Sequence, residues 1–437
     1  MSVARGKATD FSCVTTKNIT MKGANFLEKL LDNQPVEWKK LGEVFITRNG
    51  YTPSKSNPEY WEGGTIPWYR MEDIRENGRI LSDALQHITP KGVKGNGLFK
   101  ANSIILATSA TIGEHALITT EALANQRFTN FEVKEDFKDK LFPKFIFYYF
   151  YIIDDWCKKN IYVGNFPSVD VLQLKKLDFP IPPLSVQSRI VEILDKFTAM
   201  EAELEEQLQA ELELRKKQYA YYREQLLNFS YTPPPSEFNV VYKKLGEVAE
   251  LVRGNGLSKK DFAPEGIPAI HYGQIYTYYG NETKGTISFV TPETASKLRK
   301  VFCGNVVITN TSENLEDVGK ALLYSGESEA VAGGHATIIR CSEYLLPKYF
   351  VYYTMTYSFF DQKRKLAKGT KVIDVSATDL ARIEIPLPPL SEQAHIVEIL
   401  DKFDTLTNSI SEGLPLEIQL RKQQYEYYRE QLLDFRH

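Results

Sequence analysis

The chain has 437 residues, enough for two or three domains with cores of their own. Its hydrophobic content of 43% and charged content of 25% are typical of a globular protein, and the net charge of -3 lacks the basic excess common in nucleic-acid-binding chains. Four scattered cysteines, with no CxxC pair and no histidines at ligand spacing, predict a reduced, cytoplasmic protein without a structural metal. We also expect no cofactor. No apolar run reaches the length of a membrane span, and the N-terminus lacks a signal-peptide core.

The predicted elements follow a repeating order along the chain. Residues 1–24 fit neither repeated unit, and we expect a flexible extension. Residues 25–179 and 233–385 alternate short β-rich runs with Gly, Pro and Asn turns, which predicts two globular domains. Residues 180–232 and 386–437 each begin with a proline-rich strip and continue as a long helical pattern. The expected fold class is α+β.

The two helical regions are copies of one sequence, about 206 residues apart. Roughly 30 of the 50 positions from Pro180 to Phe229 are identical in the second copy, without a gap. The matched segments are Pro180–Gln187 with Pro386–Gln393, Ile190–Phe197 with Ile396–Phe403, and Arg215–Leu227 with Arg421–Leu433. Such spacing indicates a duplicated module, which should engage something two-fold or bipartite.

An apolar stripe survives where the two copies have lost identity. In the first copy it runs in steps of three and four from Ile190 through Met200 to Leu226, the spacing of an amphipathic helix. The second copy keeps it, with Leu406, Ile410, Leu414 and Ile418 standing opposite Met200, Leu204, Leu208 and Leu212. We therefore predict that the two long helices pair as an antiparallel coiled coil with pseudo-two-fold symmetry. Gly413 and Pro415 should kink or break the second helix.

The two globular domains are also similar in sequence, but less so than the two helical regions. Lys39–Val44 matches Lys243–Val248, and Ile66–Arg70 faces Ile267–His271. The shared positions are mostly apolar or turn-forming, so we expect one fold carrying different loops. A third echo relates Glu28–Asp32 to the helix ends at 224–228 and 430–434, which predicts a circular organisation with the C-terminal helix end beside the N-terminal segment.

Catalytic motifs are missing from this sequence. It contains no Walker-type phosphate loop, no G-x-S-x-G and no H-E-x-x-H, and its six histidines are isolated in sequence. Asn57–Tyr60 approaches the Asn-Pro-Pro-Tyr motif of adenine methyltransferases but lacks the second proline and a glycine-rich cofactor loop, so a turn is the better interpretation. We expect no catalytic residues.

The doubled helical motifs resemble the conserved regions of type I restriction–modification specificity subunits. The resemblance rests on the Pro-Pro-Leu-x-x-Gln strips at 182–187 and 388–393, the motifs that follow them, and the Leu-Gly-Glu-Val openings of the two domains. It implies two target recognition domains and a non-catalytic subunit that recognises a bipartite double-stranded DNA target, with one half-site for each domain. It also implies two bound methylation subunits, through which restriction subunits join, and no membrane partner.

Polar residues in the expected loops are the candidates for DNA contact, because Arg and Lys suit guanine while Asn and Gln suit adenine. In the first domain they are Arg48, Asn49, Tyr51, Lys55, Tyr69, Arg70, Lys94, Ser109, Thr111 and Arg127. In the second domain they are Arg253, Asn255, Lys259, Lys260, His271, Gln274, Tyr276, Asn310, Ser312, Lys368 and Lys371. Tyr222, Arg223, Tyr428 and Arg429, of types enriched at interface hot spots, are the candidates for partner binding.

Two other functions compete with this interpretation. A self-contained adenine methyltransferase with its own recognition domain would bind S-adenosylmethionine as the chain alone. A coiled-coil scaffold without a nucleic-acid role would show no salt-sensitive DNA binding in the presence of a methylation partner.

Overall fold

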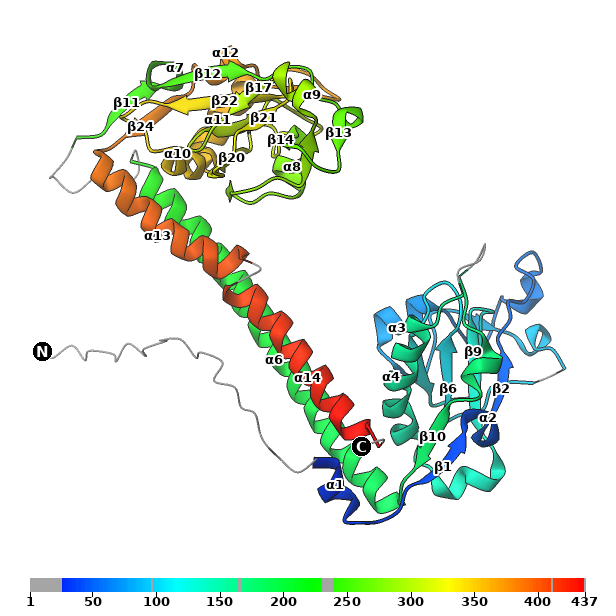
Figure 1. The fold of residues 1–437 in the computed structure, drawn as a ribbon. Coiled ribbons are helices and arrows are strands. Elements are labelled where there is room, and N and C mark those ends of the chain that lie inside the picture. Colours follow the sequence, from blue (N-terminus) through cyan, green and yellow to red (C-terminus); the bar gives the residue numbers. More distant parts are fainter. Residues whose placement is uncertain (1–25, 96, 163–166, 230–238, 410–411, 436–437) are drawn as a thin grey trace, which may run out of the picture. The chain divides into compact units, whose positions relative to one another are not determined.

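The computed structural model describes residues 26–95, 97–162, 167–229, 239–409 and 412–435, so the predicted extension of residues 1–24 lies outside the described residues. The chain divides into two compact units. The first combines the chain up to Glu203 with the segment from Arg421 onward, and the second is Leu204–Leu420. In each unit a globular domain is joined to helices (Figure 1).

A five-stranded sheet forms the centre of the first domain. Its strands are ordered β2 (Phe45–Asn49), β9 (Phe128–Val133), β6 (Ser103–Ala107), β7 (His115–Ile118) and β4 (Ile80–Leu81). β4 runs parallel to β7, and the other neighbours are antiparallel. Along β6, Ile104 and Leu106 join one core cluster while Ile105 and Ala107 join another, because successive strand residues point to opposite faces. The sheet is therefore buried on both faces at its centre.

The remaining elements of this domain surround that sheet. A three-stranded sheet is ordered β5 (His87–Ile88), β3 (Ile66–Tyr69) and β8 (Leu123–Ala124). The helices are α2 (Leu41–Val44), η1 (Pro58–Tyr60), α3 (Met71–Asn77), η2 (Pro90–Gly92), η3 (Glu135–Lys140), α4 (Pro143–Lys159) and α5 (Val171–Leu174). The strand β1 (Glu37–Lys40) pairs with β10 (Asp178–Ile181), so both ends of the domain's chain are tied together.

The second domain repeats the same sheet. Its order is β12 (Ala249–Arg253), β22 (Ala336–Cys341), β18 (Val306–Thr309), β20 (Ala321–Tyr324) and β15 (Glu282–Thr283), again with a parallel last pair. The register also repeats, since Ile104 faces Phe131 in the first domain and Val306 faces Ile339 in the second. The predicted α+β class and the duplication of one fold are confirmed.

Loops and small elements distinguish the second domain. A second five-stranded sheet is ordered β13 (Phe262–Ala263), β16 (Ser288–Val290), β14 (Ile267–Ile270), β21 (Ala330–Ala332) and β17 (Arg299–Val301). β19 (Thr311–Ser312) pairs with β23 (Ile373–Asp374), and β11 (Val241–Lys244) pairs with β24 (Glu384–Leu387). The helices are α7 (Leu245–Val248), η4 (Lys259–Asp261), α8 (Tyr272–Thr277), α9 (Pro292–Ser296), α10 (Pro347–Thr354), α11 (Tyr357–Leu366) and α12 (Ala377–Leu380).

The two helical regions differ in continuity. The first is one helix of 44 residues, α6 (Leu184–Leu227), whereas the second is two helices, α13 (Leu390–Asn408) and α14 (Gly413–Leu433). Gly413 has a φ of +78°, and a Cβ there would lie 2.6 Å from the Thr405 carbonyl oxygen. The predicted break is thus confirmed. Two positions of the predicted apolar stripe are exposed, Met200 (65%) and Tyr222 (40%), and Ile410 lies outside the described residues.

Helix pairing is antiparallel within each unit. In the second unit, Leu204, Leu208 and Leu212 of α6 cluster with Leu406, Leu414 and Ile418. Further along α6, the Tyr222 ring lies 5.4 Å from the Phe403 ring, and in the first unit the equivalent Phe197 and Tyr428 rings lie 6.1 Å apart. The two units therefore contain the same contact with the roles of the two helical regions exchanged, as pseudo-two-fold symmetry requires.

Each domain is joined to its helix through two side chains of the repeated motifs. The buried Gln187 amide bonds Phe142 N–H, Lys140 O and Pro182 O, and Gln393 makes the corresponding bonds at residues 346, 344 and 388. About two turns further along the helix, Asp195 accepts a hydrogen bond from Tyr148 (2.7 Å) on α4, as Asp401 does from Tyr352 on α10. These duplicated residues hold the domain–helix joint.

The predicted circular organisation appears in the first unit. The short helix α1 (Phe26–Leu31) places Leu27 and Leu30 in the same core cluster as Leu432 and Leu433 of α14. The C-terminal helix end and the start of the described chain therefore share one core.

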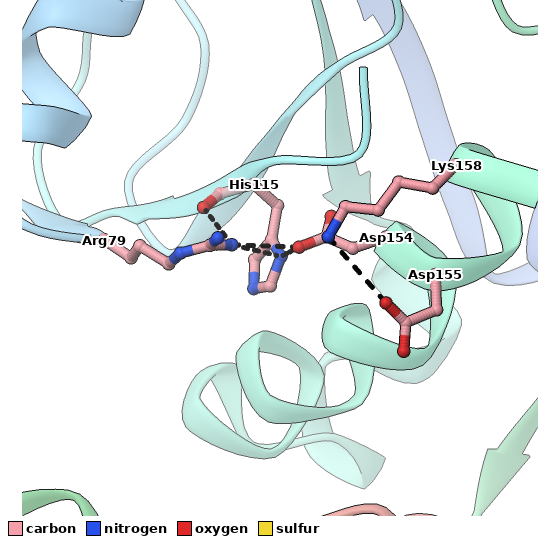
Figure 2. A network of polar contacts seen from close by, with 5 residues as sticks. All are labelled: Arg79, His115, Asp154, Asp155 and Lys158. Atoms are coloured by element: carbon pink, nitrogen blue, oxygen red, sulfur yellow. Dashed lines mark hydrogen bonds and ion pairs between the residues drawn. The ribbon is translucent and has the colours of Figure 1, made fainter. Parts of the chain in front are cut away.

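A buried ionic network fixes α4 to the sheet of the first domain (Figure 2). Asp154 accepts hydrogen bonds from His115 Nδ1 (2.7 Å) and Arg79 Nη1 (2.9 Å). Burial, the largest influence, would raise the pKa of Asp154, but His115 and Arg79 favour the charged form and hold that pKa below its usual range. A Cβ on Gly113 would lie 2.6 Å from the Asp154 carbonyl oxygen, so glycine is required at this approach.

Replacing Asp154 with Asn should lower the free energy of unfolding of the first unit by about 3–5 kcal/mol at pH 7, because Arg79 and His115 lose a buried partner. Because the folded-state pKa is depressed, this stabilisation is present above the ordinary carboxyl pKa and lost as pH falls through the lowered value. All four tryptophans belong to the first unit, so urea unfolding followed by tryptophan fluorescence measures it. Asp155→Asn, which removes a half-exposed carboxylate next door, is the control and should change stability by less than about 0.5 kcal/mol. Equal effects of the two variants would contradict the assignment.

Candidate nucleic-acid interface

The loops that carry most candidate residues meet at one end of each sheet. In the first domain the C-terminal ends of β2 and β6 lie beside the N-terminal end of β9, since Asn49 faces Thr129 and Ala107 faces Phe128. β3 and β8 run parallel and end together, and Asn125 N–H donates to the Tyr69 carbonyl oxygen (3.0 Å). The loops after β2, β3, β6 and β8 therefore converge.

A polar hollow of about 320 Å³ lies among these loops in the first domain. Its lining residues are Thr52, Lys55, Trp68, Arg70, Glu72, Asn125, Gln126 and Arg127. Three predicted DNA-binding residues, Lys55, Arg70 and Arg127, thus come together although they are spread over more than 70 positions. With one carboxylate, Glu72, against three cations, the lining attracts anions.

Arg70 lines this hollow, and its backbone is held in place by the start of a helix. It is the N-cap of α3, and its backbone N–H donates to Asp73 Oδ2 (2.6 Å), so the backbone is fixed independently of the side chain. Its Nε is buried and hydrogen-bonds no described atom, with Glu72 Oε2 3.9 Å away. The Arg127 guanidinium is exposed, and no hydrogen bond or ion pair ties it to a described residue. The Arg127 side chain can therefore bind a ligand without giving up a described contact, and the Arg70 side chain would give up only its 3.9 Å ion pair with Glu72.

The second domain places Lys259, His271 and His335 at the corresponding loops. The His271 and Tyr272 rings lie 4.6 Å apart, the Tyr272 and His335 rings 4.9 Å apart, and Thr311 Oγ1 lies 3.0 Å from His335 Nδ1. His271 is largely buried, and this burial, followed by the electrostatic influence of Lys259 and His335, lowers its pKa. Sequence reasoning missed His335 and Thr311. Aligning β22 with β9 by register would have found His335 opposite Arg127.

Several predicted contacts in the first domain instead hold its own loops. Arg48 donates to the Leu98 carbonyl oxygen (2.6 Å), and Asn49 accepts from Thr129 (2.9 Å). The Tyr51 hydroxyl bonds Lys94 N–H (2.6 Å), and the Lys94 ammonium lies 4.8 Å from the Tyr51 ring centre.

Other candidates of the first domain vary in accessibility. Tyr69 is fully buried in the core, which argues against direct contact with a ligand. Ser109 forms an isolated bridge with Ser168, and Thr111 is half-buried in the same loop. Trp68 is buried against Trp61, with ring centres 5.0 Å apart.

Two of the predicted DNA-contact residues in the second domain are buried. Asn310 is fully buried, donates to Val375 O (2.7 Å) and accepts from Thr337 (2.8 Å), and Ser312 is buried in β19. Both are structural in this arrangement, and the neighbouring Thr311 is the residue that contacts the His335 ring.

The other polar candidates of the second domain lie nearer the surface. Arg253 and Asn255 bond the backbone carbonyls of residues 334 and 297, Gln274 bonds Ser288 (2.6 Å), and Lys368 pairs with Asp379 (2.9 Å). Those without such a bond are Lys260 and Lys371, which are exposed, and Tyr276, which is half-buried with a pKa raised by burial.

The partner-binding candidates separate into two kinds. Tyr222 and Tyr428 are exposed, whereas Arg429 is buried with its guanidinium 3.9 Å from the Tyr151 ring centre, and Arg223 is half-buried over Tyr219. Arg429 therefore packs α14 against α4 of the first domain, and Arg223 packs against a tyrosine of its own helix, α6. Two tyrosines that sequence reasoning did not single out, at 221 and 427, are 59% and 57% exposed.

The described residues suggest no catalytic centre. The Asn57 side chain accepts from Glu59 N–H (3.2 Å) and starts a short turn, as expected. His115 and Asp154 form a His–Asp pair, but both are buried among Phe147, Phe150 and Tyr151, where a substrate could not reach them. Within the described part of the chain, no His, Cys, Asp and Glu cluster could hold a metal, and no helix is long and apolar enough to cross a membrane.

Comparison with known proteins identifies the family to which this duplicated fold belongs. The sequence model of the type I restriction modification DNA specificity domain matches twice, at residues 33–214 and 236–420. The type I restriction enzyme EcoprrI specificity subunit of Escherichia coli is 40% identical over 403 residues, which cover 90% of this chain and 93% of that relative. The chain belongs to the type I restriction–modification specificity family.

Solved structures agree with the fold. A chain from a study of complex assembly and conformational transition of the type I R-M system aligns with a TM-score of 0.66 at 17% identity, over 92% of this chain and 98% of that one. The HsdS subunit from Thermoanaerobacter tengcongensis aligns with a TM-score of 0.55 at 17% identity, over 91% and 97%. At this identity the likeness concerns the fold alone.

Proposed function

We propose that the chain is the non-catalytic DNA specificity subunit of a type I restriction–modification enzyme and acts in the cytoplasm. Residues 25–179 and 233–385 serve as target recognition domains, each binding one half-site of a bipartite double-stranded DNA target. Residues 180–232 and 386–437 form the conserved helical regions, which hold two methylation subunits, and restriction subunits join through those. The observation that carries the proposal is one sheet repeated with the same register but with unlike polar loops at the same end.

Local charge supports DNA binding better than the net charge of -3 does. The hollow of the first domain gathers three cations against one carboxylate, while many carboxylates lie on α6, such as Glu203 and Glu206, which are exposed there. Electrostatic attraction of phosphate decays within about 10 Å at moderate salt, so the charge at the loops decides the interaction.

Exchange of one domain tests the division of the target. Replacing residues of about 36–178 with the corresponding domain of the EcoprrI relative should change one half-site of the methylated sequence and leave the other unchanged. The reason is that the exchanged residues contain the whole five-stranded sheet of this domain together with the loops that join its strands. Single-molecule sequencing of genomic methylation measures both half-sites. The matched control exchanges residues of about 240–384 and should change the other half-site; alteration of both half-sites by either exchange would contradict the proposal.

Two equivalent tyrosine pairs are the proposed docking points for the methylation subunits. The rings of Tyr221 and Tyr222 lie 5.5 Å apart, and those of Tyr427 and Tyr428 lie 5.6 Å apart. All four are exposed and belong to segments repeated almost without change, which suits two copies of one partner.

Charge placed on these pairs should remove the partners one at a time. Tyr221→Glu or Tyr427→Glu alone should reduce the complex from two methylation subunits to one, and the double variant should bind none, because a carboxylate would be buried in the interface. Size-exclusion chromatography with light scattering measures the stoichiometry. Tyr278→Glu, at a similarly exposed tyrosine in the second domain, is the control. Two bound subunits in the double variant would rule out these docking points.

A further inference from the structure

The loop ends of the two domains share three equivalent backbone positions. The first lies five residues after a glycine that closes onto the central sheet: Gly50 N–H donates to Phe128 O (2.9 Å), and Gly254 N–H donates to Ala336 O (2.9 Å). Lys55 and Lys259 occupy this position, so the same residue type is kept in both domains.

The second position is the N-cap of the helix after β3 or β14. Arg70 and His271 are these N-caps, and both backbone N–H groups bond the side chain three residues later, Asp73 in one domain and Gln274 in the other. Since β3 and β14 occupy matching places, next to β8 and β21 respectively, the N-caps correspond in space as well as in order.

The third position precedes β9 or β22. The Arg127 carbonyl oxygen accepts from Thr108 N–H (3.0 Å), and the His335 carbonyl oxygen accepts from Asn310 N–H (2.8 Å). In the first domain these bonds involve only the backbone of Arg70 and Arg127, so both side chains can change without altering the frame. In the second domain His271 Nδ1 also accepts from Gly273 N–H (3.2 Å), and His335 Nδ1 lies 3.0 Å from Thr311 Oγ1, so each imidazole keeps its Nε2 for a ligand. Lysine is kept at the first position, while arginine is exchanged for histidine at the other two.

The lysine shared by both domains and the arginine or histidine that differs between them suit different parts of DNA. A lysine ammonium is a point charge that suits phosphate, and phosphate contacts position a protein without reading sequence. An arginine guanidinium presents paired donors that match guanine O6 and N7, whereas a neutral imidazole offers one donor and one acceptor. The kept position therefore fits the common backbone of DNA, and the exchanged positions fit bases that differ.

We infer that Arg70 and Arg127 read guanines in the first half-site, that His271 and His335 are the corresponding base-reading residues of the second, and that Lys55 and Lys259 bind phosphate in both. The inference rests on the proposed function and assigns its specificity to particular side chains. The arginine guanidiniums are available for this role, because Arg127 has no described partner and Arg70 has only Glu72 at 3.9 Å.

Substitutions in the full chain, assembled with its methylation subunit, test the assignment. Arg70→His and Arg127→His should each relax or replace the guanine requirement at one position of the first half-site, with discrimination falling on the order of 10- to 100-fold, and should leave the second half-site unchanged. Lys55→Ala should keep the same sequence but weaken binding to all duplexes and reduce the salt slope by about one. Genomic methylation mapping gives the recognised bases, and fluorescence anisotropy at several salt concentrations gives the slope.

Controls separate base reading from damage to the fold. Arg75→His changes an exposed arginine on α3 and should leave the methylated sequence as it is. Where a variant no longer methylates, sequencing the randomised duplexes bound by the assembled complex measures its preference instead. His335→Arg gives a gain-of-function arm and should add a guanine preference in the second half-site alone.

The outcomes distinguish the inference from the proposed function. A bipartite methylated sequence that stays unchanged in Arg70→His, Arg127→His and His335→Arg overturns the inference and leaves the proposed function standing. A change confined to the wrong half-site also overturns it. Absence of any bipartite sequence for the natural chain with its methylation subunit would instead refute the proposed function.

Discussion

The buried glutamine at the start of each conserved helix is the contact on which the architecture depends. Gln187 and Gln393 each join three chain segments: the loop before α4 or α10, the proline strip, and the helix itself. An amide with both donors and its acceptor satisfied by backbone is costly to remove, since any replacement leaves buried polar groups unpaired. Because this bond is made twice with the same geometry, each domain meets its helix in the same way, and its loops are presented from an equivalent frame.

Symmetry at the joints does not extend to every contact around them. In the first unit, Tyr151 lies between Arg79 and Arg429, whose guanidiniums are 4.9 Å and 3.9 Å from its ring centre. In the second domain a buried lysine, Lys363, donates to the Val318 carbonyl oxygen (2.6 Å), and burial lowers its pKa to about 8. Each of these contacts, at Tyr151 on α4 and at Lys363 on α11, therefore belongs to one copy alone. The residues that both copies share lie at the domain–helix joint and along the long helices.

Sequence reasoning predicted the features that depend on periodicity and repetition. The duplicated module, the helix pairing and the break at Gly413 follow from patterns that local physics dictates, and they are confirmed. It was weaker for single loop residues, because exposure depends on tertiary packing. Tyr69 and Asn310 are polar residues at strand ends, yet their side chains point into cores. Met200 is the opposite case, since it lies in the predicted apolar stripe and yet is exposed.

Because the two domains are copies of one fold, a few residues at their loop ends are enough to make the two loop surfaces different. A frame held by backbone bonds tolerates exchange of side chains at its loop ends, as the pairs Arg70 and His271 or Arg127 and His335 illustrate. The same freedom is absent at Gly50 and Gly254, where a Cβ would lie 2.3 Å and 2.1 Å from backbone oxygens. The two domains agree at these glycines, where the backbone needs a particular residue, and they differ at the two loop-end positions occupied by Arg70 or His271 and by Arg127 or His335. Under the function proposed above, this partition would let one fold read two different half-sites.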